Sequence, residues 1–503
     1  PPVDSRYASD RLDDLAYYVL RDFVGEGVLT VPIRDPHLED VEANRVGERV
    51  KVVPRASVLS GAAGETDGTG GFEANGDTPE AGERVPTNLA FEEETTFVDV
   101  VTGIAARDGT ELNASTPSAK VNLELDGVPQ TIRCAVALPV ISEGGPHVSI
   151  RKQRADALTP VDLIERGALS VELVTLLWLL YEHRGVVLFA GPTGVGKTTL
   201  LNAHAPFIPF DARPVSVDEG SREVRLPHET GVSLTTRDHE DAYKSVGMAE
   251  LMTEANYLNP DVEVIAEINT PESFETFAES LNTGHGVIGT THAEDVEALA
   301  NRLRERDLPA RLLREVDLVV FPRQVDGERY VSRAIEPLSE AAYDGLDPEA
   351  TRSPTGDPKR GGAGAVEAGG ESVRFNTVAW RDGDGAFRFP GAPGGDADGG
   401  VARAGATASG DGTGDGRGGP RFRVFDRIAS RTDRDREAVA AEFASKRRYV
   451  EYLVRDGVDD PEALFEFLAD LRTDEAATVE RAARTMDRDG DGDRDDSSER
   501  GRP

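Results

Sequence analysis

The sequence is poor in cysteine and contains no long apolar segment, and both shortages exclude classes of protein. Cys134 is the single cysteine among 503 residues, so internal disulfide bonds and cysteine-based zinc sites are excluded. It lies in an apolar segment, where we expect a small buried side chain. No apolar run reaches the roughly 18 residues that a membrane-spanning helix needs, and no signal peptide opens the chain. We therefore expect a soluble, cytoplasmic protein.

Lysine is also scarce, whereas acidic residues are abundant. The chain holds 92 Asp and Glu against 56 Lys and Arg, a net charge of −36, and only seven of the basic residues are Lys. A surface this negative disfavours nucleic acid and anionic lipid as direct partners at low salt. In roughly molar salt the Debye length falls to about 3 Å, so like charges repel little. The composition therefore indicates a halophile's cytosol.

One glycine-rich segment follows a short apolar run, residues 186–190, and precedes a segment that can continue as a helix. Strand, glycine-rich loop and helix is the setting of a phosphate-binding P-loop. Its backbone N–H groups and the helix N-terminus favour a polyphosphate, here ATP. In this motif Lys197 reaches the β- and γ-phosphates, and the Thr198 hydroxyl ligates Mg²⁺. The predicted nucleotide-binding residues are Gly191, Pro192, Thr193, Gly194, Val195, Gly196, Lys197, Thr198 and Thr199.

Carboxylates follow two predicted strands downstream of the P-loop. Glu219 and Glu223 come just after residues 215–217, and Glu267 lies near the end of the apolar segment 262–268. Ligands bind at the carboxyl edge of a parallel sheet, so Glu219 and Glu223 are candidates for positioning Mg²⁺ or the attacking water. Glu267 fits the Walker B pattern, in which it orients water or holds the Mg²⁺ shell. The alternatives are a solvated acidic loop and a carboxylate that only caps a strand.

Two of the eight histidines lie at either end of one predicted strand. His285 precedes the strand and His292 ends it. An imidazole can sense a γ-phosphate in its neutral or its charged form, so we predict that both residues belong to the nucleotide site. A purely structural role is the alternative. A zinc site is not expected, because no cysteine or third histidine is nearby.

Four segments together resemble those of the secretion ATPases of type II and type IV systems, whose relatives assemble pili and archaella. They are a P-loop, an acidic segment ending in Leu-Pro-His, a strand ending in Glu, and a Thr-Gly-His…Thr-x-His-Ala segment. Residues 149–164 and 301–303 fit as flanks, and residues 35–41 resemble the archaeal branch. The resemblance covers most of residues 10–342 and, loosely, residues 421–485.

The resemblance implies a homohexameric ring in which the N-terminal domain of each subunit closes over ATP bound to a RecA-like domain. Arg151 and Arg154 then approach the phosphates at the domain junction, with a plain surface role as the alternative. The implied partner is a polytopic membrane platform protein at the inner face of the cell membrane. Pilin-like or secreted substrates are engaged only indirectly, and no direct contact with nucleic acid is expected.

The sequence departs from this family at three positions. Gly220 stands where an Asp is usual, Ala266 replaces a Gly, and Asn269 replaces an Arg. The missing arginine would carry charge across a subunit interface, so these changes bear on hydrolysis rather than on phosphate binding. The main hypothesis is an ATP-hydrolysing motor for secretion or pilus-like filament assembly. The alternatives are an ATP-binding regulatory or scaffold subunit and a conjugation-type DNA-transfer motor.

The expected fold class is α/β, with a RecA-like P-loop NTPase core between an α/β N-terminal domain and a small helical C-terminal region. Alternation of strands and helices in the core predicts a parallel sheet. The predicted boundaries are an N-terminal unit at 1–60, a flexible insert at 61–84, the N-terminal domain at 85–183, the ATPase domain at 184–342, a low-complexity region with a short hairpin at 343–420, a helical region at 421–485 and a disordered tail at 486–503.

Overall fold

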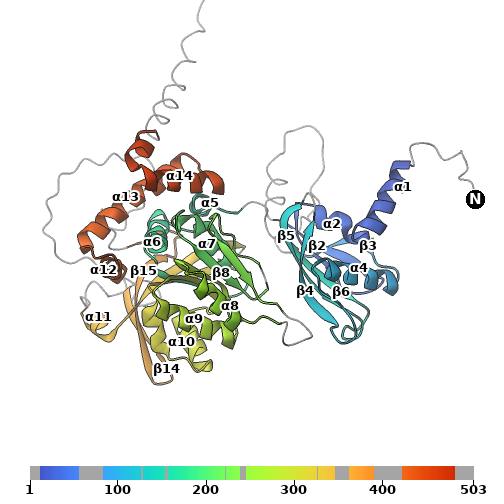
Figure 1. Cartoon of the computed structure of the whole chain (residues 1–503), viewed down its shortest axis with the longest axis horizontal. Helices are drawn as coiled ribbons and strands as arrows, with labels where there is room; N and C mark the ends of the chain where they lie inside the picture. Colours follow the sequence, from blue (N-terminus) through green and yellow to red (C-terminus); the bar gives the residue numbers. More distant parts are fainter. Residues whose placement is uncertain are drawn as a thin grey trace, which may run out of the picture. The chain divides into compact units, whose positions relative to one another are not determined.

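The chain divides into two compact units, Pro1–Asp156 and Ala157–Pro503, each built around its own sheet (Figure 1). None of the helices in the part of the chain that is described is long and apolar enough to cross a membrane. The structure, a computed structural model, describes residues 12–55, 83–125, 128–152, 157–220, 222–237, 245–325, 327–345, 362–389 and 422–481.

The first unit is a six-stranded antiparallel sheet in the order β3-β2-β1-β6-β5-β4. Side chains alternate between buried and more exposed along β6, as expected for a sheet with one covered face. Phe97, Val101 and Ile104 of α4 are buried in the core of this unit. Its elements are α1 (Leu12–Val19), η2 (Leu20–Val24), η3 (Gly27–Leu29), α2 (Thr30–Arg34), β1 (Leu38–Ala43), β2 (Arg49–Pro54), β3 (Val85–Ala90), α4 (Glu94–Arg107), β4 (Ser118–Leu125), β5 (Val128–Ala137) and β6 (His147–Lys152).

The second unit holds a ten-stranded mixed sheet in the order β14-β15-β13-β12-β7-β11-β10-β8-β9, with β16 paired to β15. From β12 to β9 every pair is parallel, and from β12 to β14 every pair is antiparallel. The strands are β7 (Val186–Ala190), β8 (Pro214–Asp218), β9 (Val232–Thr235), β10 (Val262–Ile268), β11 (Gly286–Thr291), β12 (Leu318–Val325), β13 (Glu328–Leu338), β14 (Gly362–Ala368), β15 (Glu371–Arg381) and β16 (Phe387–Arg388).

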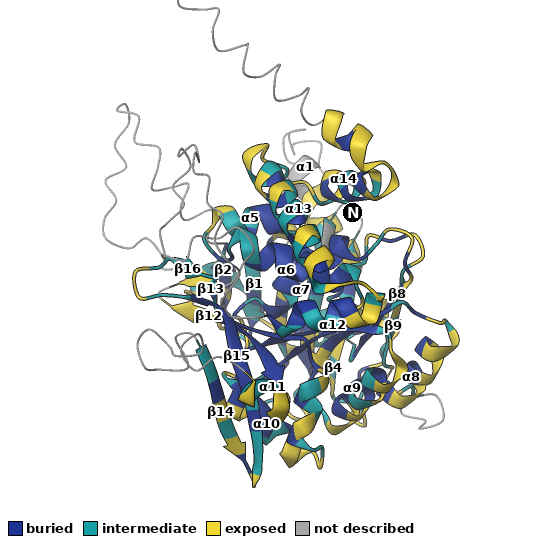
Figure 2. Cartoon of the chain, turned by 90° about the vertical axis from the view of Figure 1, so that its left-hand side faces the viewer, coloured by how far each residue is buried: buried dark blue, intermediate teal, exposed yellow. Residues whose placement is uncertain are grey.

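Helices cover both faces of this sheet (Figure 2). On one face, α6 is apolar all round and buried from Leu173 to Tyr181, and α7, α12, α13 and α14 share its core. On the other face lie α8, α9 and α10, each with one apolar side. The helices are α5 (Pro160–Glu165), α6 (Val171–Glu182), α7 (Lys197–His204), η4 (Ala205–Phe207), α8 (Met248–Tyr257), α9 (Pro271–Thr283), α10 (Val296–Glu305), η6 (Ala310–Glu315), α11 (Glu340–Asp344), α12 (Arg423–Thr432), α13 (Arg436–Arg455) and α14 (Pro461–Thr473).

The α/β fold class predicted from the sequence is confirmed, but the limits of the two units differ from the predicted boundaries. The units divide at Asp156 and Ala157, not after residue 183, because α5 and α6 pack in the core of the second unit. The predicted units 1–60 and 85–183 share one sheet as far as Lys152, because β1 pairs with both β2 and β6. Residues 61–82 and 486–503 lie outside the described residues.

The region expected to be of low complexity supplies three strands to the main sheet. The predicted hairpin exists as β15 paired with β16, through Trp380 and Arg388 and through Arg381 and Phe387. β15 also pairs with β13 on one side and β14 on the other, which the prediction did not include. The sequence of β14, Gly-Ala-Gly-Ala-Val-Glu-Ala, carries little of the β-branched and aromatic signal that identifies a strand.

Candidate functional site

The glycine-rich loop leaves the centre of the main sheet. All five residues of β7 are buried, and β7 pairs in parallel with β11 and β12. A Cβ atom on Gly191 would lie 3.0 Å from the carbonyl oxygen of Pro322, so a side chain there would crowd the neighbouring strand β12. Gly196 adopts φ +93° as the N-cap of α7, and with no side chain it leaves the first N–H groups of this helix open to a ligand. The loop therefore has the geometry of an anion site.

Lys197, the first residue of α7, points back into this loop. Its side chain is buried, and Nζ donates to the carbonyl oxygen of Pro192 at 3.0 Å. Burial lowers the pKa of Lys197 to about 8, while the negative charge of Glu267 opposes the shift. An ammonium group held among backbone groups in this way is suited to contact a bound phosphate.

The acidic segment 218–228, which follows β8, is fastened to the first turns of α7. The Thr198 hydroxyl donates to Glu223 Oε2 at 3.0 Å, and the Asn202 amide donates to the Glu223 carbonyl oxygen at 2.8 Å. The Glu223 N–H in turn donates to Asp218 Oδ2 at 3.1 Å. A hydroxyl and a carboxylate in contact are hard oxygen donors of the kind that Mg²⁺ takes in small number beside substrate phosphates. The donor set of Thr198 and Glu223 therefore fits Mg²⁺.

Glu267 and His292 form a pair beside Lys197. His292 Nε2 lies 2.6 Å from Glu267 Oε1, and His292 Nδ1 lies 3.5 Å from Lys197 Nζ. Because an ammonium can only donate, Nδ1 is the acceptor and Nε2–H donates to the carboxylate. The hydrogen bond from His292 lowers the pKa of Glu267 against the effect of burial, and Asn269 contributes in the same direction. Glu267 is therefore held as a carboxylate.

Glu219 directly follows β8, so it lies at the same edge of the sheet. Its Oε1 accepts a hydrogen bond of 2.5 Å from the Thr270 hydroxyl. Burial raises the pKa of Glu219, Thr270 opposes this, and the nearby charge of Glu267 adds to the rise. The pKa values of the two carboxylates are thus moved in opposite directions, a pattern typical of acid–base sites.

Sequence reasoning missed Arg302, which carries positive charge to the position of the missing arginine. Arg302 Nη1 on α10 donates to Asn269 Oδ1 at 3.3 Å, and Arg306 Nη2 reaches the Asn269 carbonyl oxygen at 3.5 Å. The charge of Arg302 also contributes to lowering the pKa of Lys197. The flank 301–303 was recognised in the sequence, but only the packing of α10 brings it to the end of β10.

One predicted residue of the second unit, His285, is not brought to this edge. His285 lies before β11 and His292 after it, so at about 3.3 Å per residue they stand about 23 Å apart. His285 Nδ1 instead lies 3.2 Å from Glu263 Oε1, so its predicted role beside the nucleotide is not supported in this unit. Arg151 lies in the first unit, 3.7 Å from Glu39. Arg154 lies outside the described residues, and the predicted roles of both arginines stay predictions.

A family profile described as "Type II/IV secretion system protein" matches residues 111–325. The chain belongs to this family. An uncharacterized protein of Methanocaldococcus jannaschii is 27% identical over 348 residues, which is 68% of this chain and 57% of that protein. A second uncharacterized protein of that organism is 32% identical over 189 residues, 37% of this chain and 69% of its own length. This member of the secretion family thus spans little more than half of the first relative.

The crystal structure of the pilus retraction motor PilT with bound ADP is similar at 15% identity, with a TM-score of 0.43. The similar region covers 63% of this chain and 84% of that chain. A likeness this distant adds nothing to the assignment of the site. A haloarchaeal origin is not supported by these matches and stays a prediction from composition.

Proposed function

We propose that this member of the type II/IV secretion family is an ATP-hydrolysing motor that powers secretion or pilus-like filament assembly. The proposal is supported above all by the clustering of Lys197, Thr198–Glu223 and Glu267–His292 at one edge of a parallel sheet. Phosphate-binding, oxygen-donor and carboxylate groups are the parts that phosphoryl transfer to water needs.

In the proposed reaction, loop N–H groups and Lys197 bind the β- and γ-phosphates. Thr198 and Glu223 would hold Mg²⁺, which would supply positive charge against the phosphates when bound. Glu267 accepts a hydrogen bond from the attacking water, whose oxygen forms a bond to the γ-phosphorus as the bond to the β–γ bridging oxygen breaks. His292 keeps Glu267 oriented through its Nε2–H. The products are ADP and hydrogen phosphate, which keeps one proton of the water, and the other proton is released to solvent.

The quaternary part of the proposal follows from the family resemblance. We propose a homohexamer, placed at the cytoplasmic face of the cell membrane by a polytopic platform protein, with pilin-like or secreted substrates engaged through that partner. The strongly acidic composition suits contact with basic cytoplasmic loops, which membrane proteins carry in excess. It disfavours direct contact with nucleic acid.

The alternative supported by a specific observation is an ATP-binding regulatory or scaffold subunit that hydrolyses slowly. Asn269 stands where the family has arginine, and Gly220 and Ala266 are further departures. Against this alternative, Arg302 lies in contact with Asn269 and supplies a cation close to Lys197. A conjugation-type DNA-transfer motor would share the same nucleotide site.

The test compares the full chain with three variants. Fluorescent ATP binding and phosphate release are measured for the wild type, Lys197→Ala and Glu267→Gln, with the exposed Lys120→Ala as matched control. We expect Lys197→Ala to lose binding, and Glu267→Gln to bind but release phosphate about 10²-fold more slowly, as for loss of one catalytic group. Binding that survives Lys197→Ala refutes the P-loop assignment. A wild-type rate equal to that of Glu267→Gln favours the scaffold, and DNA-stimulated turnover favours the transfer motor.

A further inference from the structure

The β12–β13 hairpin, residues 322–325 and 328–331, lies beside the P-loop. A Cβ atom on Gly191 would lie 3.0 Å from a carbonyl oxygen of this hairpin, so the two backbones are in close contact. On its second strand, the Val331 N–H donates to the carbonyl oxygen of Ala168 at 2.9 Å, in the loop between α5 and α6. The hairpin is therefore held next to the proposed nucleotide site from both of its strands.

An extra residue in β13 decides which face of this hairpin its side chains occupy. Phe321 pairs with Arg333, whereas the next residue of β12 pairs with Val331, so Ser332 is left over as a β-bulge. Arg333 lies over the ring of Phe321, in the core shared with α8, α9 and α10, but Val331 is buried in the core shared with α6 and α7. In a regular strand these two residues would share one face. The bulge thus turns Val331, and with it Arg329, toward the face on which α7 lies.

Arg329 consequently lies beside the first turn of α7. A Cβ atom on Gly196 would lie 4.0 Å from Arg329 Cδ and 3.9 Å from Thr199 Cβ, so both side chains border the same space next to the P-loop. Arg329 and Thr199 are both exposed. Within the described part of the chain, the guanidinium group of Arg329 has neither an ion pair nor a hydrogen bond. Its charge is therefore available to a ligand of the loop.

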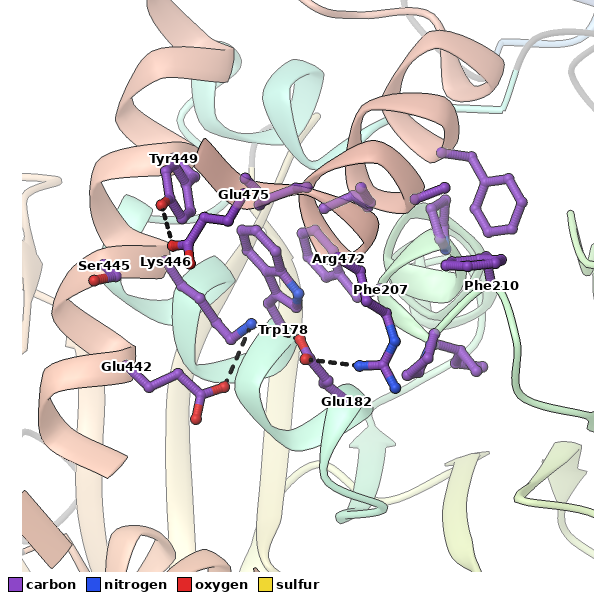
Figure 3. A pocket seen from close by; sticks show the side chains of 17 residues that line it. Trp178, Glu182, Phe207, Phe210, Glu442, Ser445, Lys446, Tyr449, Arg472 and Glu475 are labelled. Carbon is purple, nitrogen blue, oxygen red and sulfur yellow. Dashed lines mark hydrogen bonds and ion pairs between the residues drawn. The ribbon is translucent and has the colours of Figure 1, made fainter. Parts of the chain in front are cut away.

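The cations that line the cavity among α6, α13 and α14 differ from Arg329 in this respect. This cavity has a volume of about 360 Å³ (Figure 3). Arg472 binds Glu182 there at 3.2 Å, and Lys446 binds Glu442 at 3.4 Å. Their charges are already compensated by carboxylates. Arg329 is thus the better candidate for binding an anionic ligand.

The position of the hairpin indicates which part of a nucleotide Arg329 can reach. β7 lies between β11 and β12, so the P-loop has His292 on one side and the hairpin on the other. Lys197 Nζ lies 3.5 Å from His292 Nδ1, so in the proposed function the γ-phosphate lies toward β11. The α-phosphate then lies at the other end of the loop, where its N–H groups also bind. Arg329 and Thr199 border that end.

We propose that Arg329 binds the α-phosphate of the nucleotide from the β12–β13 hairpin. The inference rests on the proposed nucleotide-binding function and adds a residue to that site. A guanidinium group can donate two parallel N–H bonds to phosphate oxygens, which makes arginine well suited to this contact. ATP and ADP both carry the α-phosphate, and hydrolysis leaves it unchanged. The contact therefore strengthens the binding of both nucleotides equally and does not accelerate the chemical step.

The test compares Arg329→Ala and Arg329→Lys with the wild-type full chain. Dissociation constants are measured by calorimetry, in the presence of Mg²⁺, for ATPγS, ADP and inorganic tripolyphosphate, beside KM and kcat for ATP. The matched control is Arg323→Ala. Arg323 is also exposed and pairs with Tyr330, so it lies on the opposite face of the same hairpin from Arg329.

We expect Arg329→Ala to weaken the binding of all three ligands about tenfold, because a hydrogen-bonded charge pair is lost. The KM for ATP rises by a similar factor, whereas kcat stays within about threefold of the wild-type value. Arg329→Lys, which keeps the charge but not the two parallel donors, recovers part of the affinity. Arg323→Ala leaves every dissociation constant within about twofold.

Three outcomes would overturn the role of Arg329 while leaving the proposed function intact. The first is unchanged affinity in Arg329→Ala. The second is a loss for ATPγS and ADP without a loss for tripolyphosphate, which would move the contact to the nucleoside. The third is an equal loss in Arg323→Ala, which would reduce the effect to net charge. Absence of ATPγS binding in the wild type refutes the proposed function itself, and the contact with it.

Discussion

Replacing Asp317 by alanine is expected to destabilise the second unit strongly. The side chain is completely buried, and its removal leaves the Val186 N–H without its acceptor, at a cost of about 1–3 kcal/mol. Arg427 and Arg431 lose their partner as well, but their side chains are 29% and 33% exposed, so water compensates part of that loss. Breaking a buried pair costs about 3–5 kcal/mol, and we expect about 4 kcal/mol in total.

The unfolding of the second unit can be followed without interference from the first, because both tryptophans, Trp178 and Trp380, lie in the second. Urea unfolding of the full chain, read by tryptophan emission, gives the difference in free energy of unfolding. Glu371→Ala, which breaks an exposed pair with Arg311, is the matched control and is expected to cost below about 0.5 kcal/mol. A cost below about 1 kcal/mol for Asp317→Ala would show that α12 does not depend on this carboxylate.

Three further predictions follow from the site and the core. Arg302→Ala should lower kcat for ATP hydrolysis about 10²-fold with little effect on ADP binding. Adding Asn269→Arg to this variant should restore part of the lost kcat. An unchanged kcat in Arg302→Ala would refute the role of this charge. His292→Ala should lower kcat by a similar factor. His285→Asn should leave the KM for ATP within about twofold of the wild-type value. A larger change in KM would show that His285 contributes to the nucleotide site. Burial raises the pKa of Glu336 from 4.5 to about 7, so its stabilising effect is complete below pH 4.5 and lost as pH rises through 7. Urea unfolding should therefore show that the free energy of unfolding of the wild type falls by about 3 kcal/mol between pH 4.5 and 8. Glu336→Gln should not show this fall. The prediction is wrong if the free energies of unfolding of wild type and variant differ by the same amount at every pH.

Much of the candidate site could be predicted because its parts are local in sequence. The P-loop residues are consecutive, and Glu267 and His292 each stand at the end of a recognisable strand. The predicted role of His285 beside the nucleotide has no such support in this unit. Both histidines flank one strand, and the two ends of a strand lie at opposite edges of a parallel sheet, so only one of them can share the edge of the P-loop.

The features that sequence reasoning missed depend on contacts between distant segments. Arg302 lies 33 residues after Asn269, and no periodicity links the two positions. Asp317 directly precedes the apolar strand β12, and its partners on α12 come more than 100 residues later in the chain. β14 has a composition typical of a linker, and its pairing with β15 is what makes it a strand. Tertiary packing, not local pattern, decides each of these.

The position of Asp317, which binds both α12 and the first residue of β7, has a consequence for how the protein is made. The strand entering the P-loop emerges from the ribosome about 240 residues before Arg427, which at 5–20 residues per second is a delay of roughly 12–48 s. Until then the Asp317 carboxylate lacks its cationic partners. The second unit therefore completes its core only after α12 has been synthesised, and truncated chains ending before residue 422 should depend on chaperones to remain unaggregated.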